Sequence, residues 1–162
     1  MAIRIVEATV ADVPVILDMI RGLAEYEKLT HEVVATEEKL RESLFGAEPA
    51  AEVVLAYWGA ECAGFALYFP TYSTFLAQRG IYLEDLFVKS DWRGRGVGFA
   101  LLRYLAKIAV QRGCGRVEWG VLNWNSPSIE FYKRLGAVAM DEWSKYRLTG
   151  AALEKLAVNE RE

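Results

Sequence analysis

Apolar residues recur every three or four positions in several segments of the chain, which is the spacing of an amphipathic helix. The first segment runs from Val13 to Leu23 and follows Thr9 and Asp12, a threonine and an acid at capping distance. Thr36 precedes two glutamates, which the helix dipole favours in a first turn, and begins a second helix. Proline in a first turn and glycine after a last turn delimit further helices. The sequence therefore predicts helices at residues 13–23, from 36 onward, at 97–112 and at 126–136.

Short β-rich runs bounded by turn residues predict strands between these helices. The resulting order is β-α-α-β-β-β-α-β-α-β-β, with a block of hairpins in the middle. Such mixing predicts an α/β fold, in which one sheet carries helices on both faces. No linker or repeat divides the chain, so we expect one domain over residues 1–162. The predicted strands are Ile3–Ala8, Val53–Trp58, Cys62–Phe69, Ile81–Val88, Arg116–Leu122, Ala137–Met140 and Trp143–Leu148.

The composition is that of one soluble globular domain, with 162 residues, 53% hydrophobic and 25% charged. The net charge of −3 argues against a protein that coats nucleic acid. No apolar run approaches about 18 residues, and the acid Glu7 interrupts the N-terminal segment, so we expect neither a membrane-spanning helix nor a signal peptide. Cys62 and Cys114 are far apart in sequence, which favours two free thiols and a cytoplasmic location. With His31 as its single histidine, the chain offers little for a histidine triad, and we expect no metal.

A glycine-rich loop, Arg93–Gly98, lies between a predicted strand and the long helix that begins at Val97. Glycines allow the backbone to approach a ligand, and the unpaired N–H groups of a helix start suit an anion such as a pyrophosphate. The string required for a P-loop does not occur, and the third glycine position of a Rossmann fingerprint falls on Phe99 or Leu101. A flexible turn with helix-packing glycines stays the alternative interpretation.

Three motifs together resemble one superfamily. Arg93, Gly96 and Gly98 form the string Arg-x-x-Gly-x-Gly, which follows 82–88 (YLEDLFV) and precedes 125–137 (NSPSIEFYKRLGA). This pattern resembles the GNAT superfamily of N-acetyltransferases, and within it the diamine (spermidine/spermine) and thialysine acetyltransferases. The resemblance runs from Ile3 to Leu148, whereas 46–64 looks shorter than in the animal enzymes and 140–144 departs from them.

The resemblance implies a single GNAT-like domain that uses acetyl-CoA as co-substrate. It implies that the glycine loop holds the pyrophosphate through backbone N–H groups and that the strand before it pairs with the pantetheine arm. A bulge in this strand would leave an N–H group to polarise the thioester carbonyl. The implied cofactor-binding residues are Leu86, Phe87, Val88, Arg93, Gly94, Arg95, Gly96, Val97, Gly98, Phe99, Asn125, Ser126, Pro127, Ser128 and Tyr132.

Two residues match catalytic positions of the family. Tyr132 matches the tyrosine that protonates the departing thiolate, a role that a phenol can fill; from the residues alone, a core tyrosine is the more typical interpretation. Glu84 matches an acid near the reacting amine, acting through water, whereas an exposed edge position is the alternative. An acid in an apolar strand is unfavourable unless it is paired, solvated or used.

The implied substrate-binding residues are acids and aromatics. Strand alternation places Glu84 and Asp85 on opposite faces, and likewise allows only one of Glu118 and Trp119 to face the substrate. A primary amine is roughly 0.1% neutral at pH 7.4, about 4 kcal/mol from its reactive form, so the site needs a proton acceptor and rates should rise above neutral pH. The implied substrate-binding residues are Tyr26, Glu27, Glu84, Asp85, Glu118 and Trp119.

The sequence therefore predicts an acetyl-CoA-dependent N-acetyltransferase that joins both substrates in a ternary complex. A polyamine or diamine is the first expected acceptor, and a lysine-like amino acid such as thialysine or a protein amine is the alternative. A non-catalytic acyl-CoA sensor is disfavoured because Tyr132 and Glu84 are both present. We expect no nucleic-acid or membrane partner, and the resemblance implies a homodimer.

Overall fold

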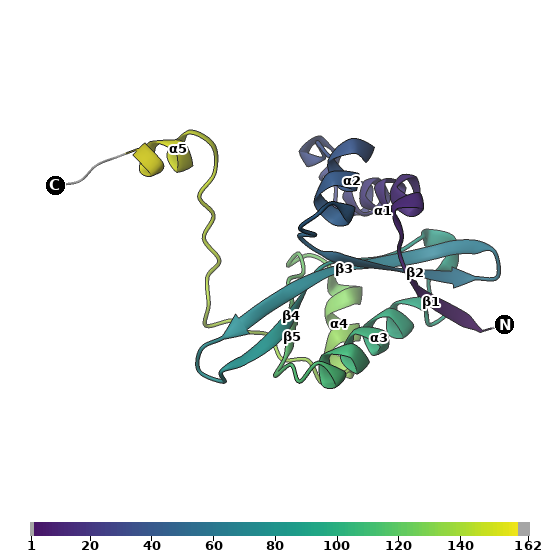
Figure 1. Cartoon of the computed structure of the whole chain (residues 1–162). Coiled ribbons are helices and arrows are strands. Elements are labelled where there is room, and N and C mark those ends of the chain that lie inside the picture. Colours follow the sequence, from purple (N-terminus) through teal and green to yellow (C-terminus); the bar gives the residue numbers. More distant parts are fainter. Residues whose placement is uncertain (1, 159–162) are drawn as a thin grey trace. The chain divides into compact units, whose positions relative to one another are not determined.

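The computed structural model describes residues 2–158 and divides the chain into two compact units. The first unit ends at Leu122 and the second begins at Asn123. Their positions relative to each other are not determined (Figure 1). The expectation of a single domain stays a prediction.

The first unit is built on a five-stranded sheet in the order β1-β2-β3-β4-β5. The first four strands pair antiparallel with their sequence neighbours, as hairpin connections require, and β5 lies parallel to β4. This mixed sheet confirms the predicted α/β class. The strands are β1 (Ile3–Glu7), β2 (Glu52–Trp58), β3 (Glu61–Ser73), β4 (Gln78–Val88) and β5 (Val117–Trp119).

Helices cover both faces of this sheet (Figure 1). On one face, α1 (Val13–Tyr26) and α2 (Glu37–Phe45) bury the apolar stripes that the helical spacing predicts. The Thr36 side chain caps α2 by accepting a hydrogen bond from the Lys39 backbone N–H. On the other face, α3 (Val97–Gln111) packs across all five strands. Three 3₁₀ turns link these elements: η1 (Val10–Asp12), η2 (Thr30–Glu32) and η3 (Ser90–Trp92).

Helix α1 lies close to β4, where Gly22 contacts the ring of Phe87. A Cβ on Gly22 of α1 would lie 2.7 Å from a ring carbon of Phe87, so only glycine lets the helix lie directly on that ring. Phe87 belongs to the core beneath α1 and α2. The other face carries Tyr68, whose pKa is raised by burial and by the nearby Glu52 and Tyr104, the latter on α3.

A bulge interrupts β4 at Glu84. Leu67 of β3 lies opposite Asp85, but the next residue, Tyr68, lies opposite Leu83. Glu84 is thus an extra residue between two paired ones, which breaks the strict alternation of side chains along this strand.

The second unit contains α4 (Ser126–Arg134) and α5 (Gly150–Val158). The sequence predicts α4 and its end near Gly136, which has a positive φ of 88°. The prediction of two strands at 137–140 and 143–148 is wrong, because residues 137–149 contain neither helix nor strand. They run as an extended segment between α4 and α5 (Figure 1). Alternating apolar residues indicate an extended chain, but a strand also needs a paired neighbour, which a local pattern does not supply.

Cys62 and Cys114 are free thiols, as expected. Within residues 2–158, no helix combines the length and apolar character needed to cross a membrane.

Candidate active site

The glycine loop forms a bare helix start. Gly94 and Gly96 have positive φ values of 73° and 84°, which favour glycine, and Gly96 is the N-cap of α3. No side chain caps this end in the described chain, and the first turn of α3 holds no acid. The backbone N–H groups and the positive end of the helix dipole therefore suit an anion of the size of a pyrophosphate.

Arg93 fixes the loop to the rest of the first unit. Its Nε donates a hydrogen bond to the Val88 carbonyl oxygen at 3.0 Å. Its guanidinium also lies 4.8 Å from the ring centroid of Tyr26, at the end of α1, and 5.8 Å from that of Phe87. Tyr26, predicted to bind substrate, is thus brought against the loop predicted to bind the cofactor.

Arg95 lies over a second aromatic pair. Its guanidinium is 5.1 Å from the ring centroid of Trp92 and 5.8 Å from that of Trp58, and these two rings are 5.5 Å apart. The loop is therefore anchored on both sides by arginine–aromatic contacts, while its glycines leave the backbone accessible.

β4 extends beyond its parallel neighbour. Pairing with β5 ends at Leu83, opposite Trp119, whereas β4 continues to Val88. Along Leu86–Val88 the edge toward β5 has no β5 partner, and exposed strand edges readily pair with another extended chain. This edge leads directly into the glycine loop, which suits an extended ligand arm with amide groups.

Three acids gather near the bulge. Burial, and then the charges of Glu84 and Glu27, raise the pKa of Asp85 to about 6. Burial also raises the pKa of Glu27, next to Tyr26 at the end of α1. Glu84 itself is exposed. The structure therefore brings together Glu27, Glu84 and Asp85, a concentration of negative charge that a cationic amine would neutralise.

The bulge changes which side chains share a face with Asp85. Asp85 lies opposite Leu67, and Tyr82 lies opposite Phe69, two residues farther along the regular strand β3. Tyr82 and Asp85 therefore share the α1 face although three positions separate them. Expectations based on unbroken alternation do not carry across Glu84.

The same pairing separates Glu118 from Trp119. Glu118 is paired with Tyr82 and lies on the α1 face, whereas Trp119 is paired with Leu83, which lies opposite Tyr68 on the α3 face. Glu118 is thus the one that shares a face with Asp85.

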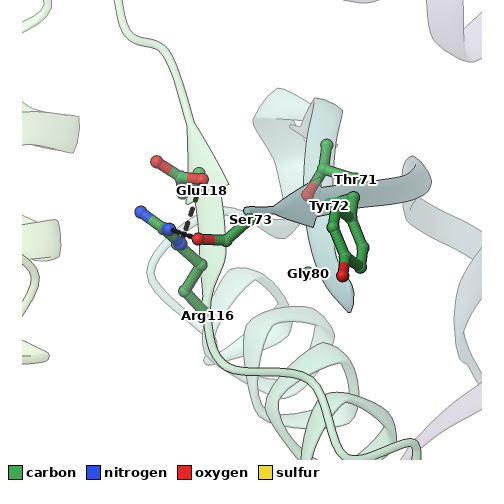
Figure 2. Close-up of a pocket in the computed structure, with 6 residues that line it drawn as sticks. All are labelled: Thr71, Tyr72, Ser73, Gly80, Arg116 and Glu118. Carbon is green, nitrogen blue, oxygen red and sulfur yellow. Dashed lines mark hydrogen bonds and ion pairs between the residues drawn. The ribbon is translucent and has the colours of Figure 1, made fainter. Parts of the chain in front are cut away.

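Sequence reasoning missed a pocket at the far end of this face (Figure 2). Its residues include Arg116, which stands two positions before Glu118 and therefore on the same face. That period-two spacing was a signal that the sequence contained. The pocket is lined by Thr71, Tyr72, Ser73, Gly80, Arg116 and Glu118.

The second unit holds the other predicted residues. The Asn125 side chain accepts a hydrogen bond from the Ser128 backbone N–H at 3.4 Å and caps α4, and Pro127 occupies its first turn. Tyr132 lies on α4 with its ring centroid 5.8 Å from that of Phe131. Whether Asn125–Ser128 and Tyr132 face the loop and acids of the first unit stays a prediction.

Comparison with known proteins identifies the superfamily. The sequence model described as the Acetyltransferase (GNAT) family matches residues 20–137, most of the chain and a span that includes parts of both units. The chain belongs to the GNAT family of acetyltransferases. This match confirms the resemblance based on the glycine loop and its flanking motifs. It also confirms the prediction that the protein is an N-acetyltransferase.

Individual GNAT relatives align along nearly the whole chain. The chain is 40% identical to the thialysine N-epsilon-acetyltransferase of Sus scrofa, with 96% of this chain and 98% of the relative covered. It is 35% identical to the L-ornithine N5-acetyltransferase of Arabidopsis thaliana, with 94% and 87% covered. Among solved structures, an integron cassette protein from the mobile metagenome of V. cholerae superposes with a TM-score of 0.82 at 29% identity, with 98% and 99% covered.

GNAT enzymes use acetyl-CoA as co-substrate, and the described residues fit that ligand. The bare N-terminus of α3 suits its pyrophosphate, and the open edge of β4 suits its amide-containing arm. The acids of the α1 face suit an amine acceptor. The first unit therefore contains features for both partners of an acetyl transfer.

Proposed function

We infer that this GNAT enzyme transfers an acetyl group from acetyl-CoA to the side-chain amine of a small amino acid with a terminal amine. The observation that carries this inference is the half-buried carboxyl group of Asp85 on β4. One end of this strand leads into the glycine loop. Toward the other end, the sheet face that carries Asp85 also carries further polar groups. The relatives named for thialysine and L-ornithine, both amino acids with a terminal amine, support this choice of acceptor.

Acetyl-CoA supplies the activated thioester, and the chain supplies its binding groups. The N–H groups of the loop Arg93–Gly98 and of the first turn of α3 hold the pyrophosphate, while the edge at Leu86–Val88, which β5 does not pair with, binds the pantetheine amides. By the motif they match, Asn125–Ser128 are assigned to the far side of this arm. The N–H groups at the bulge are available to polarise the thioester carbonyl.

The acids prepare the acceptor amine. Asp85 and Glu27 bind the cationic amine, because a partly buried carboxylate is stabilised by an opposite charge placed beside it. Glu84, exposed at the bulge, receives the proton through water. Once neutral, the amine attacks the thioester carbonyl directly: the C–N bond forms, the C–S bond breaks, and the proton that the nitrogen loses leaves through water to solvent at Glu84. The position of the amine beside the carbonyl provides much of the acceleration.

Tyr132 acts as the proton donor to the departing thiolate. Its place on α4, after the capped first turn at Asn125, gives the phenol a rigid support. No covalent intermediate with the enzyme is required for this transfer.

A polyamine or diamine is the second candidate acceptor. The observation that favours it is the cluster of Glu27, Glu84 and Asp85, which attracts any elongated cation. The two candidates differ in the carboxylate, which only an amino acid carries.

The enzyme is expected to work as a homodimer in the cytoplasm. The exposed apolar side chains of Val138, Trp143 and Tyr146, in the extended segment after α4, support a second copy as partner.

A thiol-release assay with acetyl-CoA tests this function. We expect turnover with L-thialysine, L-lysine or L-ornithine, with rates that rise with pH above neutrality because more of the amine is neutral. Tyr132→Phe should lower kcat by about 10²-fold or more with little change in KM, whereas Tyr57→Phe, at a ring stacked on Arg4 in the first unit, should not. Turnover with none of the amino acids or polyamines, or an unchanged kcat in Tyr132→Phe, would contradict the proposed mechanism.

A further inference from the structure

A pocket of about 220 Å³ lies where the β3–β4 hairpin meets the start of β5 (Figure 2). Gly80 leaves it open: a Cβ there would lie 2.7 Å from the Thr71 Oγ1 and 3.2 Å from the Arg116 carbonyl oxygen. Thr71 lies opposite Gly80, two residues beyond Phe69, so the pocket opens on the face that carries Asp85.

We propose that this pocket binds the α-carboxylate and α-ammonium groups of the amino-acid acceptor, with Arg116 and Glu118 as its two recognition residues. The proposal rests on the proposed function and deepens it. It assigns to this site a preference for free α-amino acids over amines that lack a carboxylate.

Arg116 is positioned to bind the carboxylate. Its backbone carbonyl accepts a hydrogen bond from the Ile81 N–H at 3.0 Å, so the base of the side chain is part of the sheet. Its Nη2 donates to the Ser73 Oγ, and its Nε lies 3.8 Å from a Glu118 oxygen (Figure 2). These contacts orient a planar group with five N–H donors, and that geometry matches a carboxylate in a bidentate pair.

Glu118 is positioned to bind the ammonium. Its side chain is 44% exposed, so an incoming cation can reach it without opening the fold. The 3.8 Å separation from Arg116 is an ion pair looser than a hydrogen bond. A zwitterion placed across this pair meets opposite charge at both of its ends.

The spacing along the sheet suits a lysine-like molecule. Glu118 is paired with Tyr82. The β3 partners of Tyr82 and Asp85 are two residues apart, which is a distance along the strand of about 7 Å at the usual rise. Arg116 is level with Gly80, about 13 Å from Asp85 on the same measure. The terminal amine and α-carbon of an extended lysine-like side chain are about 6 Å apart, and the long side chain of Arg116 extends from its backbone toward Glu118.

The test compares each amino acid with the amine that lacks its carboxylate: L-lysine with cadaverine, and L-thialysine with bis(2-aminoethyl) sulfide. Arg116→Gln should lower kcat/KM at least 10-fold for the amino acids, mainly through KM, and change it less than twofold for the diamines. Arg116→Lys should restore part of the loss, because it keeps the charge without the planar pair of donors. Glu118→Gln should raise KM for both members of each pair, since both carry a second ammonium.

Arg112→Gln is the matched control. Arg112 pairs with Glu52 through two hydrogen bonds of 2.8 Å, and both partners are 43% exposed, close to the values at Arg116 and Glu118. It lies outside the pocket, so it should leave the ratio of amino acid to diamine unchanged. An equal loss for amino acids and diamines in Arg116→Gln, with no partial recovery in Arg116→Lys, would assign Arg116 a structural role and overturn the proposal. A wild-type enzyme that acetylates the diamines but not the amino acids overturns it too, and turnover of neither class overturns the proposed function itself.

Discussion

At the scale of single residues, the chemistry of the site depends on a carboxyl group held away from water. Asp85 faces α1 next to the buried Phe87, and Glu27 and Glu84 add negative charge around it. The sequence identifies the Glu84–Asp85 pair as acids in an apolar strand. It does not indicate which one is buried, because the bulge that decides this depends on pairing with β3.

Asp85→Asn should stabilise the protein at neutral pH. Because the pKa of Asp85 is raised to about 6 in the folded state, the folded protein holds this proton more tightly than the unfolded chain does. Asp85 therefore does not change the free energy of unfolding below about pH 4, where it is protonated in both states. Its contribution lowers the free energy of unfolding as pH rises toward 6, and the reduction stays at up to about 3 kcal/mol at higher pH. The asparagine variant should have a higher Tm than wild type at pH 7.5, with the difference vanishing near pH 4.

Thermal unfolding of both proteins between pH 4 and pH 8 measures this difference. Asp18→Asn, at an exposed aspartate on α1, serves as the control and should show no comparable pH dependence. A lower Tm for Asp85→Asn at pH 7.5 would mean that the aspartate is stabilising in its charged form, contrary to the burial described above.

At the scale of elements, local patterns predict what local forces decide. The stripes from Val13 to Leu23 and the cap at Thr36 predict α1 and α2 because the period and the capping bond lie within the helix itself. The full lengths of β3 and β4 escape prediction because the residues that extend them, 70–73 and 78–80, are strand only through the pairing between β3 and β4. The segment 137–149 shows the same limit in reverse, since an alternating pattern there lacks a paired strand.

Gly96→Ala should weaken coenzyme A binding without unfolding α3. Both Gly96 and Gly136 have positive φ values, 84° and 88°, and no atom closer than 4.0 Å would meet a Cβ at either one. An alanine therefore introduces a similar backbone strain of about 1–2 kcal/mol at each site. Of the two glycines, only Gly96 lies at the N-terminus of α3. Only its variant should therefore also weaken coenzyme A binding, with a rise in Kd of at least 10-fold.

Isothermal titration calorimetry with coenzyme A measures the loss of binding, and thermal unfolding measures the loss of stability from backbone strain. The two variants should lose similar stability, whereas Gly136→Ala should keep the wild-type Kd. If both bind coenzyme A as wild type does, the pyrophosphate does not lie at the start of α3.

At the scale of the whole molecule, the exposed segment after α4 bears on assembly. Val138, Trp143 and Tyr146 are 79%, 78% and 93% exposed in this extended stretch. Large apolar side chains grouped in this way favour burial against another surface. Neither the hydrophobic pattern nor the composition indicates which surface that is, because both describe one chain only.

Light scattering should give a particle of twice the 18.2 kDa chain mass if a second copy covers this segment. Trp143→Glu should then raise the dimer dissociation constant at least 10-fold, because a charge would replace an apolar contact in the interface. Val110→Glu is the matched control, since Val110 is 80% exposed on α3, outside the segment, and should leave the dimer intact. A monomer at every concentration would contradict the homodimer, and equal dissociation in both variants would move the interface away from the segment. A dimer that persists in Trp143→Glu but dissociates in Val110→Glu would instead place α3 at the contact, where the coenzyme A helix and the subunit interface would then be one element.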